Sequence, residues 1–526
     1  MTVKIYDTTL RDGTQAEDFN LQLEDKLKIA QKLDELGVHY IEGGWPGSNP
    51  KDIQFFERIR NFHLKNARIA AFGSTHHPRN LPQNDRNLNA LLEAGAEVIT
   101  IFGKSWDLHV KDALNISLER NLEIIYDSLS YLRPHVKELF YDAEHFFDGF
   151  KRNPEYALAT IKRAIEAGAD CIILCDTNGG TLPHEIPEII SVIKDRFKGI
   201  SWGIHAHNDA ESAVANTLIA VKLGADQVQG TINGVGERCG NANLCSVIPA
   251  LKLKMGIDCV SDEQLSKLTS LSRFVTELLN IPHPKYLPYV GRSAFAHKGG
   301  VHASAVKRNP NTYEHIPPEK VGNSRRILVS ELSGKGTILS KAKEYGLSLN
   351  DVDIKNILQH LKELENQGFQ FDVAEASFKL MMHRTCGLLP HYFKLLTYRV
   401  RDYNTLEGRP IAEAEIWVEV KGEARHAMSL GQGPVNALDR ALRKAIEGFY
   451  PSLKEMSLID YRVRVLPGIL GTEAKIRVLI ESKDRQCSWR TVGVSHDILE
   501  ASLQALVDSI IYKLFKDNIE GLYDGS

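Results

Sequence analysis

A regular alternation of short β-rich runs and amphipathic stretches over the first 250 or so residues constrains the fold more than any other feature. The first amphipathic stretch ends at Gly37 and three later ones end in a Gly-Ala pair, as expected where glycine terminates a helix in the left-handed conformation. Strand–helix alternation is typical of parallel βαβ units with right-handed crossovers. The eight β-rich runs read KIYD, VHYIEGG, RIAAFGS, EVITIFG, KELFYDAEH, CIILCDTN, SWGIHAHND and DQVQGTI. Eight such units predict an α/β fold of the (β/α)8 barrel type, and the lack of GxGxxG after the first run argues against a dinucleotide-binding sheet.

Polar side chains collect at the ends of these predicted strands. Arg11 and Asp12 follow the first run, and Glu42 lies in the second. A (β/α)8 barrel carries its active site at the carboxyl ends of its strands, so we predict the active site at this rim. The later runs place further polar residues there: Asp142, Glu144, Asp176, Thr177, Asn178, His205, His207, Asn208 and Asp209, followed after the last run by Glu237, Arg238 and Asn241.

His205 and His207 form the strongest single feature of the chain. Residues two apart on a strand point to the same face, so both imidazoles can face one point. With a strand-end carboxylate such as Asp12 and an amide oxygen such as Asn241, they form a mixed nitrogen and oxygen set. Such a set suits a divalent ion with open positions for substrate and water. The alternative is a pair of histidines that only satisfy hydrogen bonds at a strand end.

The identity of the metal stays open at this point. A structural zinc site is not expected, because no cysteine cluster accompanies the histidines. Mg²⁺, Mn²⁺ and catalytic Zn²⁺ all fit. Arg11, beside Asp12, carries a fixed fork of donors that suits a carboxylate or a developing enolate. Its alternative role is a strand-end ion pair with Asp7 or Asp12.

The rest of the chain has a different organisation. We predict a catalytic barrel at 1–275, linker subdomains rich in proline, glycine and histidine and then in helices at 276–389, and a C-terminal α+β domain at 390–520. The last segment alternates strand-rich runs such as AEAEIWVEVKGEARHAMSLG with helical stretches such as PVNALDRALRKAIEGFY. A chain of 526 residues is too long for one core, so several domains are expected.

Composition limits the partners and the compartment. A formal net charge of −3 gives no electrostatic argument for nucleic acid. No apolar run approaches the roughly 20 residues that span a bilayer, and the N-terminus lacks a basic region followed by an apolar stretch. The seven cysteines are scattered without a CxxC pair, and Cys171 and Cys175 suggest reduced core thiols. We expect a cytoplasmic protein that binds neither nucleic acid nor membrane.

Several long motifs, in the right order, resemble one family. DTTLRDGTQ, HAHND, GERCGNANL and AHKGGVHASAV are similar to the metal-dependent acyltransferases of the isopropylmalate synthase and citramalate synthase family. VGNSRRILVSELSGKG and GQGPVNALDRAL resemble that family's linking subdomains and its C-terminal allosteric domain. The resemblance runs nearly end to end. It implies a barrel of the superfamily that also contains the hydroxymethylglutaryl-coenzyme A lyases.

The resemblance also implies a reaction. Members condense acetyl-coenzyme A with a 2-oxo acid in a Claisen reaction and then hydrolyse the thioester. By the family's pattern, Asp12, His205, His207 and Asn241 bind the divalent metal, which chelates the oxo acid and polarises its ketone. Arg11 then stabilises the developing charge on oxygen. Mg²⁺ or Mn²⁺ is the expected ion, with Zn²⁺ as the alternative.

The family's pattern assigns roles to further residues. Gln15 and Thr177, with Arg11, are expected to contact the oxo acid, and Glu144 matches the catalytic carboxylate of the fifth strand. His302 matches the histidine proposed to take part in deprotonating the acetyl methyl group, and Tyr313 is a looser match to a catalytic tyrosine. In the family these last two lie in a subdomain that reaches over the partner's barrel. An active homodimer is therefore implied.

Two departures from the commonest family motifs point to the acceptor. Thr14 stands where isopropylmalate and homocitrate synthases usually carry glutamate, and YIEGGWPGSNPKD differs from the usual IEVGFP. Both variants are similar to one branch of citramalate synthases, which use pyruvate to form citramalate in the first step of the pyruvate route to isoleucine. Trp45 either shrinks the acid pocket or only packs. The alternative acceptor is 2-oxoisovalerate, for isopropylmalate synthesis.

Two other classes of protein are alternatives to an acyltransferase. A lyase or aldolase of the same superfamily would use the same metal site to cleave a carbon–carbon bond, but such lyases lack the C-terminal allosteric domain. A non-catalytic amino-acid sensor would have lost Arg11, Glu144 or a metal ligand, and all are present. In the family the C-terminal domain binds the end-product amino acid, isoleucine for a citramalate enzyme. GQGPVNALDRAL is otherwise a glycine turn with proline opening a helix.

Overall fold

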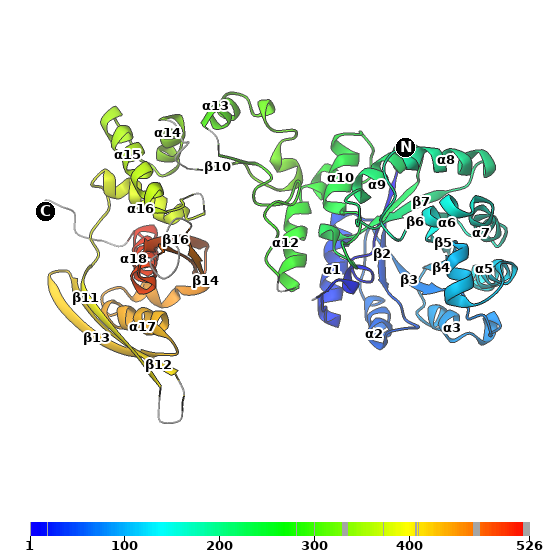
Figure 1. Ribbon diagram of the computed structural model, residues 1–526, viewed down its shortest axis with the longest axis horizontal. Coiled ribbons are helices and arrows are strands. Elements are labelled where there is room, and N and C mark those ends of the chain that lie inside the picture. Colours follow the sequence, from blue (N-terminus) through cyan, green and yellow to red (C-terminus); the bar gives the residue numbers. More distant parts are fainter. Residues whose placement is uncertain are drawn as a thin grey trace. The chain divides into compact units, whose positions relative to one another are not determined.

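Eight parallel strands close into a barrel in sequence order (Figure 1). Each strand pairs with its neighbour along the chain, and β1 closes the barrel by pairing with β8, with Asp7 opposite Gly230. The strands are β1 (Lys4–Asp7), β2 (Tyr40–Gly44), β3 (Arg68–Ser74), β4 (Val98–Lys104), β5 (Glu138–Glu144), β6 (Cys171–Asp176), β7 (Trp202–Ala206) and β8 (Gln227–Gly230). The predicted (β/α)8 barrel is confirmed.

This structure is a computed structural model. It describes residues 2–17, 19–279, 281–298, 300–328, 335–371, 373–404, 408, 410–466 and 474–518. In this part of the chain no helix combines the length and the apolar character needed to cross a membrane. Two units are distinguished, one formed by Met1–Ala296 with Glu314–Arg326 and the other by His297–Tyr313 with Ile327–Ser526.

Helices connect the strands and cover the outside of the barrel. α1 ends where the sequence predicts, because Gly37 adopts a left-handed conformation with φ 86° and its N–H donates to the last helical carbonyls. The connecting helices are α1 (Leu23–Leu36), α2 (Pro50–Ile59), α3 (Arg86–Glu93), α4 (Asp107–His109), α5 (Leu118–Leu132), α6 (Phe146–Arg152), α7 (Pro154–Glu166), α8 (Glu185–Arg196), α9 (Ala213–Lys222) and α10 (Leu244–Leu253).

The barrel has two apolar layers, as the alternation of side chains along a strand requires. One layer fills the space between strands and helices. The other fills the barrel interior with rings and thiols from four strands, in which Tyr6, Tyr40 and Phe140 contact one another. Cys171 and Cys175 are buried in this layer and free, as predicted.

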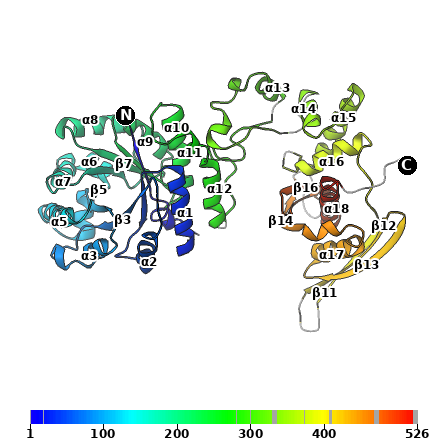
Figure 2. The same cartoon turned by 180° about the vertical axis from the view of Figure 1, so that it is seen from behind.

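The chain between the barrel and the C-terminal domain is mostly helical. α11 (Asp262–Leu265) and α12 (Leu268–Leu278) belong to the barrel unit, and α12 lies beside α1 in both views (Figures 1 and 2). The remaining elements are short strands and helices: β9 (Ala296–His297), α13 (Gly300–Arg308), β10 (Arg326–Ile327), α14 (Lys335–Glu344), α15 (Asp351–Gln367) and α16 (Glu375–Thr385).

The C-terminal part contains two copies of one arrangement, three antiparallel strands followed by a helix (Figure 2). In the first copy, alternate residues of the central strand are fully buried and pack with the following helix. The copies are β11 (Lys394–Asn404), β12 (Pro410–Val420), β13 (Glu423–Gly431) with α17 (Pro434–Ile446), and β14 (Ser457–Val465), β15 (Ile476–Lys483), β16 (Ser488–Ser495) with α18 (Ile498–Lys516). The predicted α+β character is confirmed.

Candidate metal centre and active site

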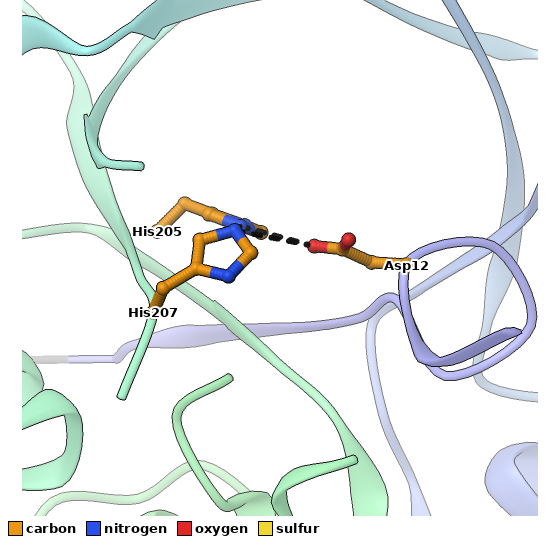
Figure 3. Close-up of side chains that lie close together, drawn as sticks. All are labelled: Asp12, His205 and His207. Carbon is orange, nitrogen blue, oxygen red and sulfur yellow. Dashed lines mark hydrogen bonds and ion pairs between the residues drawn. The ribbon is translucent and has the colours of Figure 1, made fainter. Parts of the chain in front are cut away.

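Asp12, His205 and His207 meet at the carboxyl end of the barrel (Figure 3). Asp12 lies in the turn that follows β1, His205 lies in β7, and His207 directly follows that strand. One ligand atom from each of the three lies within 4.8 Å of the other two. His205 Nε2 is 3.1 Å and His207 Nε2 is 3.9 Å from Asp12 Oδ2. The two histidines therefore share one face, as predicted.

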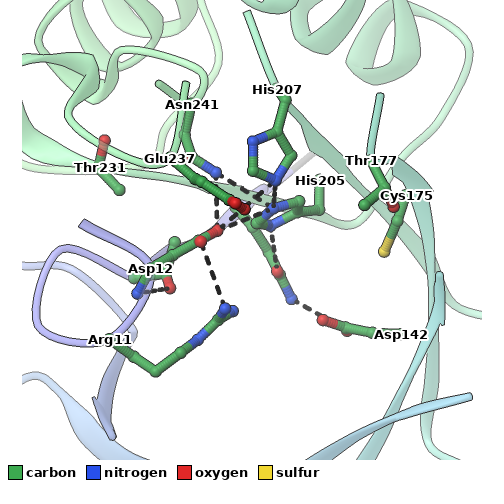
Figure 4. Close-up of polar contacts among 12 residues, drawn as sticks. Arg11, Asp12, Asp142, Cys175, Thr177, His205, His207, Thr231, Glu237 and Asn241 are labelled. Atoms are coloured by element: carbon green, nitrogen blue, oxygen red, sulfur yellow. Dashed lines mark hydrogen bonds and ion pairs between the residues drawn. The ribbon is translucent and has the colours of Figure 1, made fainter. Parts of the chain in front are cut away.

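Asn241 adds an amide to this group (Figure 4). It lies in the loop after β8 and bridges to His207 through the backbone. Its Nδ2 donates to Asp12 Oδ2 over 2.8 Å and lies 3.2 Å from His205 Nε2, whereas its Oδ1 is buried without a hydrogen-bond partner in the described structure. Gly236 leaves room for this amide, because a Cβ there would lie 1.9 Å from Asn241 Oδ1.

The charge states of Asp12 and His207 suit a cation. Burial alone would raise the pKa of the Asp12 carboxyl, but the Arg11 guanidinium and the hydrogen bond from His205 hold it well below its ordinary value of 3.8. Burial lowers the pKa of His207 to about 3. Asp12 is therefore charged and His207 neutral at ordinary pH, which are the states in which these side chains bind a metal.

Arg11 lies beside the candidate metal ligands and pairs with a buried carboxylate. Its Nε donates to Glu42 Oε2 over 2.6 Å, and its guanidinium carbon lies 3.7 Å from the centre of the Phe72 ring. Glu42 is 0% exposed and also accepts hydrogen bonds from the hydroxyls of Tyr6 and Thr8. Glu42 and the Phe72 ring thus orient the guanidinium. The ion pair with Asp12 considered from the sequence is also present, with Arg11 Nη1 at 3.4 Å from Asp12 Oδ1, but Glu42 is the nearer carboxylate.

The other predicted residues of the barrel rim have different surroundings. Glu144, at the end of β5, forms an ion pair with Lys104 at the end of β4. Thr177 Oγ1 accepts a hydrogen bond of 2.8 Å from the backbone N–H of His145. The side chain of Gln15 is exposed at the end of the 3₁₀ turn Gly13–Gln15. In the described part of the chain, the side chains of these three residues make no hydrogen bond or ion pair with the group around Asp12, although the backbone N–H of Gln15 donates to the Asp12 carbonyl over 3.0 Å.

One interior residue, Gln229, has no role in the sequence-based prediction. Gln229, on β8, lies between His205 and Asp142 and contacts both through its amide. The sequence does contain a signal for it, since Gln227 and Gln229 are polar residues two apart on a short strand. Glu42 and Asp142 were recognised as strand-end residues without an assigned task.

Three family models match consecutive parts of the chain. A model described as HMGL-like matches residues 2–275, one described as homocitrate synthase post-HMGL domain-like matches 289–368, and one described as LeuA allosteric (dimerisation) domain matches 372–514.

Curated relatives match over nearly the whole chain. The (R)-citramalate synthase of Geobacter sulfurreducens is 58% identical over 99% of each chain, and that of Aquifex aeolicus is 55% identical over 99% of each chain. The 2-isopropylmalate synthase of Methanocaldococcus jannaschii is 31% identical over 97% of this chain and 94% of its own. The chain belongs to the citramalate synthase and isopropylmalate synthase family. The resemblance stated from the motifs is confirmed.

In this chain the motif at the second strand contains an aromatic residue, Trp45. The Trp45 ring packs edge-on against Phe72 and Phe102, with centroid distances of 5.8 and 5.5 Å, and its Nε1 donates to Asn87 Oδ1 over 2.6 Å. Since Phe72 also contacts the guanidinium beside the metal ligands, this wall borders the candidate site. Thr14, by contrast, donates its hydroxyl to the Arg11 carbonyl over 2.6 Å and closes the turn.

The family's predicted histidine and tyrosine lie in the second unit. His302, on α13, and Tyr313 stack on each other with ring centroids 4.1 Å apart and planes 27° apart. Both side chains are exposed. The structure thus brings these two residues together within their unit, and their catalytic roles stay predictions.

Proposed function

We propose that this chain is an (R)-citramalate synthase. It condenses acetyl-coenzyme A with pyruvate and hydrolyses the thioester with water, giving citramalate and coenzyme A. One observation carries the choice of acceptor: five curated relatives named (R)-citramalate synthase are 45–58% identical over at least 97% of this chain. Relatives named 2-isopropylmalate synthase are 31–33% identical over a similar share.

Asp12, His205, His207 and Asn241 would hold the divalent cation. The fit rests on the donor set, one carboxylate and two imidazoles whose ligand atoms lie within 4.8 Å of one another, and on the unpartnered Oδ1 of Asn241 in the described structure. Rotation of that amide would bring its oxygen beside Asp12 and His205. A set without thiolate favours Mg²⁺ or Mn²⁺, with catalytic Zn²⁺ as the alternative. When bound, the cation supplies a Lewis acid for the ketone of the oxo acid.

Arg11 binds the oxo acid and stabilises the negative charge that develops on its oxygen next to this cation. Its Nε is held by Glu42, so the remaining donors of its fork can face the substrate. The 12% exposure of its side chain means that water competes little for those donors, which strengthens them. Thr177 and Gln15 complete the contacts to the oxo acid by the family's pattern.

Glu144, His302 and Tyr313 are proposed to handle protons. Glu144 is the carboxylate at the end of β5, and it forms an ion pair with Lys104. The stacked His302 and Tyr313 pair is assigned to deprotonation of the acetyl methyl group. By the family's pattern it acts on the barrel of a partner subunit, so the active form is a homodimer.

Regulation is assigned to the C-terminal part of the chain. The match of residues 372–514 to the LeuA allosteric (dimerisation) domain supports an amino-acid effector, for which we propose isoleucine, and supports dimerisation. The same match disfavours a lyase. All seven cysteines are free, which favours a reducing cytoplasm.

The test is release of coenzyme A thiol from acetyl-coenzyme A by metal-loaded protein. Pyruvate, 2-oxoisovalerate, 2-oxoglutarate and no acceptor are compared, and the highest kcat/KM is expected with pyruvate. Asp12→Asn is the matched variant, because it keeps the size of the side chain and removes the ligand charge; its thiol release is expected to disappear. A preference for 2-oxoisovalerate would establish isopropylmalate synthesis instead.

A further inference from the structure

A glutamine connects one of the proposed metal ligands to a buried carboxyl group. Gln229 Oε1 lies 2.9 Å from His205 Nδ1, and Gln229 Nε2 lies 3.4 Å from Asp142 Oδ1. We infer that Gln229, braced by Asp142, is a positioning residue that fixes the ring and the tautomer of His205 for metal binding. This inference rests on the metal site of the proposed function.

The direction of each hydrogen bond follows from the chemistry of the ligand. An imidazole that offers Nε2 to a cation is neutral and carries its proton on Nδ1. His205 therefore donates, and the acceptor must be the amide oxygen of Gln229. The amide nitrogen then points the other way, and Asp142 Oδ1 accepts from it (Figure 4). The two ends of the amide are thus assigned without ambiguity.

Burial makes this arrangement selective. The exposed fractions of Gln229, Asp142 and His205 are 0%, 3% and 5%, so water cannot replace a lost partner. A buried donor without an acceptor is destabilising, which disfavours the wrong tautomer. Burial also raises the pKa of Asp142 to about 7, and the amide donor offsets part of the cost of its charge.

The second histidine offers a contrast within the same site. The Nδ1 of His207 is buried and has no hydrogen-bond partner in the described part of the chain. The His207 ring is therefore fixed only through its Nε2, whereas the His205 ring is also fixed at Nδ1 by Gln229. Loss of Gln229 would leave neither imidazole with a hydrogen bond at Nδ1, and metal affinity should fall accordingly.

A purely structural role for an interior glutamine is the competing explanation, and the chain contains a matched control for it. Gln227 lies two residues earlier on the same strand and is 1% exposed. Its Nε2 has no hydrogen-bond partner in the described structure. Methionine has a similar length and volume to glutamine but no amide. Gln227→Met thus repeats the change in interior packing without touching His205.

The experiment is a calorimetric titration of full-length, metal-free protein with Mn²⁺. Gln229→Met is expected to weaken binding by about ten- to a hundredfold, whereas Gln227→Met should bind as the wild type does. The combination of Gln229→Glu with Asp142→Asn moves the carboxylate from one position to the other. It keeps an acceptor for His205 Nδ1 and keeps a hydrogen bond between positions 229 and 142, with the direction of that second bond reversed. It should restore affinity to within a few-fold. The far-UV circular dichroism and unfolding midpoint of each metal-free variant show that it has folded.

Wild-type affinity in Gln229→Met, or an equal loss in Gln227→Met, would overturn the inference. Failure of the combined variant to recover affinity while folded would overturn it as well. Absence of Mn²⁺ binding by the wild type would instead overturn the metal site on which the proposed function rests. Turnover provides a second readout of a positioning role. At saturating Mn²⁺, Gln229→Met should regain most of the wild-type kcat, because the residue positions a metal ligand and does not touch substrate.

Discussion

Single residues of the barrel rim illustrate how buried carboxylates are tolerated next to one another. Asp12 has Arg11 and Asn241 as partners, and Glu42 receives Arg11 and two hydroxyls. Each of these two groups has a cation within reach, so the low dielectric of the interior strengthens the attraction. Asp7 differs, because in the described part of the chain its carboxylate oxygens accept hydrogen bonds from the backbone N–H and the hydroxyl of Thr9 and from no cation.

The difference affects the pKa of Asp7. Burial raises the pKa of Asp7 to about 7 from its ordinary value of 3.8, although the hydrogen bonds from Thr9 act in the opposite direction. Between these two values the unfolded chain has lost the proton and the folded chain still holds it. The free energy of unfolding therefore falls as the pH rises from about 4 to 7, by at most about 1.4 kcal/mol per pH unit for this group.

Asp7→Asn is expected to remove this contribution. The variant should show a shallower fall in the urea midpoint of the metal-free barrel between pH 4.5 and 7 than the wild type. Asp142 adds a slope of the same sign, so the comparison is between the two slopes and not their absolute values. Asp112→Asn, at an exposed position, serves as the control, and identical slopes in Asp7→Asn and wild type would refute the assignment.

At the scale of elements, three adjacent strands build one aromatic wall. Trp45 follows β2, Phe72 lies on β3 and Phe102 on β4, so the side-by-side order of the strands places the three rings together. The helix α3 fixes the wall from outside: Asp85 caps its first turn, and Asn87 of that turn holds the indole N–H. This explains how Trp45 can pack and border the acceptor site at once.

Removal of the indole should therefore change the choice of acceptor. Trp45→Ala is expected to raise the ratio of kcat/KM for 2-oxoisovalerate to that for pyruvate by about tenfold, since apolar pockets discriminate by about 1–3 kcal/mol per methylene. Trp45→Phe keeps an aromatic ring and should change the ratio less. Loss of activity toward both acceptors in parallel would mean that Trp45 only packs.

At the scale of the whole molecule, the C-terminal part carries exposed apolar side chains on one face of its first sheet. The buried residues of β12 face α17, and the opposite face of the sheet presents Met428 and Leu430, 46% and 47% exposed, beside the stacked rings of Trp417 and His426. Glu415 and Glu413 lie opposite Met428 and Leu430 on this face, which therefore combines apolar and charged groups, as interaction surfaces do. The dimerisation domain matched by residues 372–514 supports a second copy as its occupant.

The proposed homodimer can be tested on this face. Met428→Glu combined with Leu430→Glu places two charges on it and should shift the protein from dimer to monomer in sedimentation velocity at micromolar concentration. Leu81→Glu changes a leucine that is 58% exposed in the barrel unit and should leave the dimer intact. A dimer that persists in the charged variant would assign the interface elsewhere.

Local patterns of the sequence determined a large part of this architecture. The alternation of strand and helix, the glycine that ends α1, and the two histidines on one face of β7 all follow from periods of a few residues. These periods are properties of the backbone, so they can be read without knowing what packs where. The fold class and the meeting of Asp12, His205 and His207 were therefore predictable, whereas the catalytic tasks of Glu144, Gln15 and Thr177 stay predictions.

Tertiary structure alone decided how the site is supported. Arg11 pairs with Glu42, 31 residues away, and Gln229 reaches Asp142, 87 residues away. No local period relates such positions. They become neighbours because the barrel closes and turns alternate side chains of distant strands into one interior. The sequence by itself determined which elements form and which ligands face each other; barrel closure decided which buried groups hold those ligands in place.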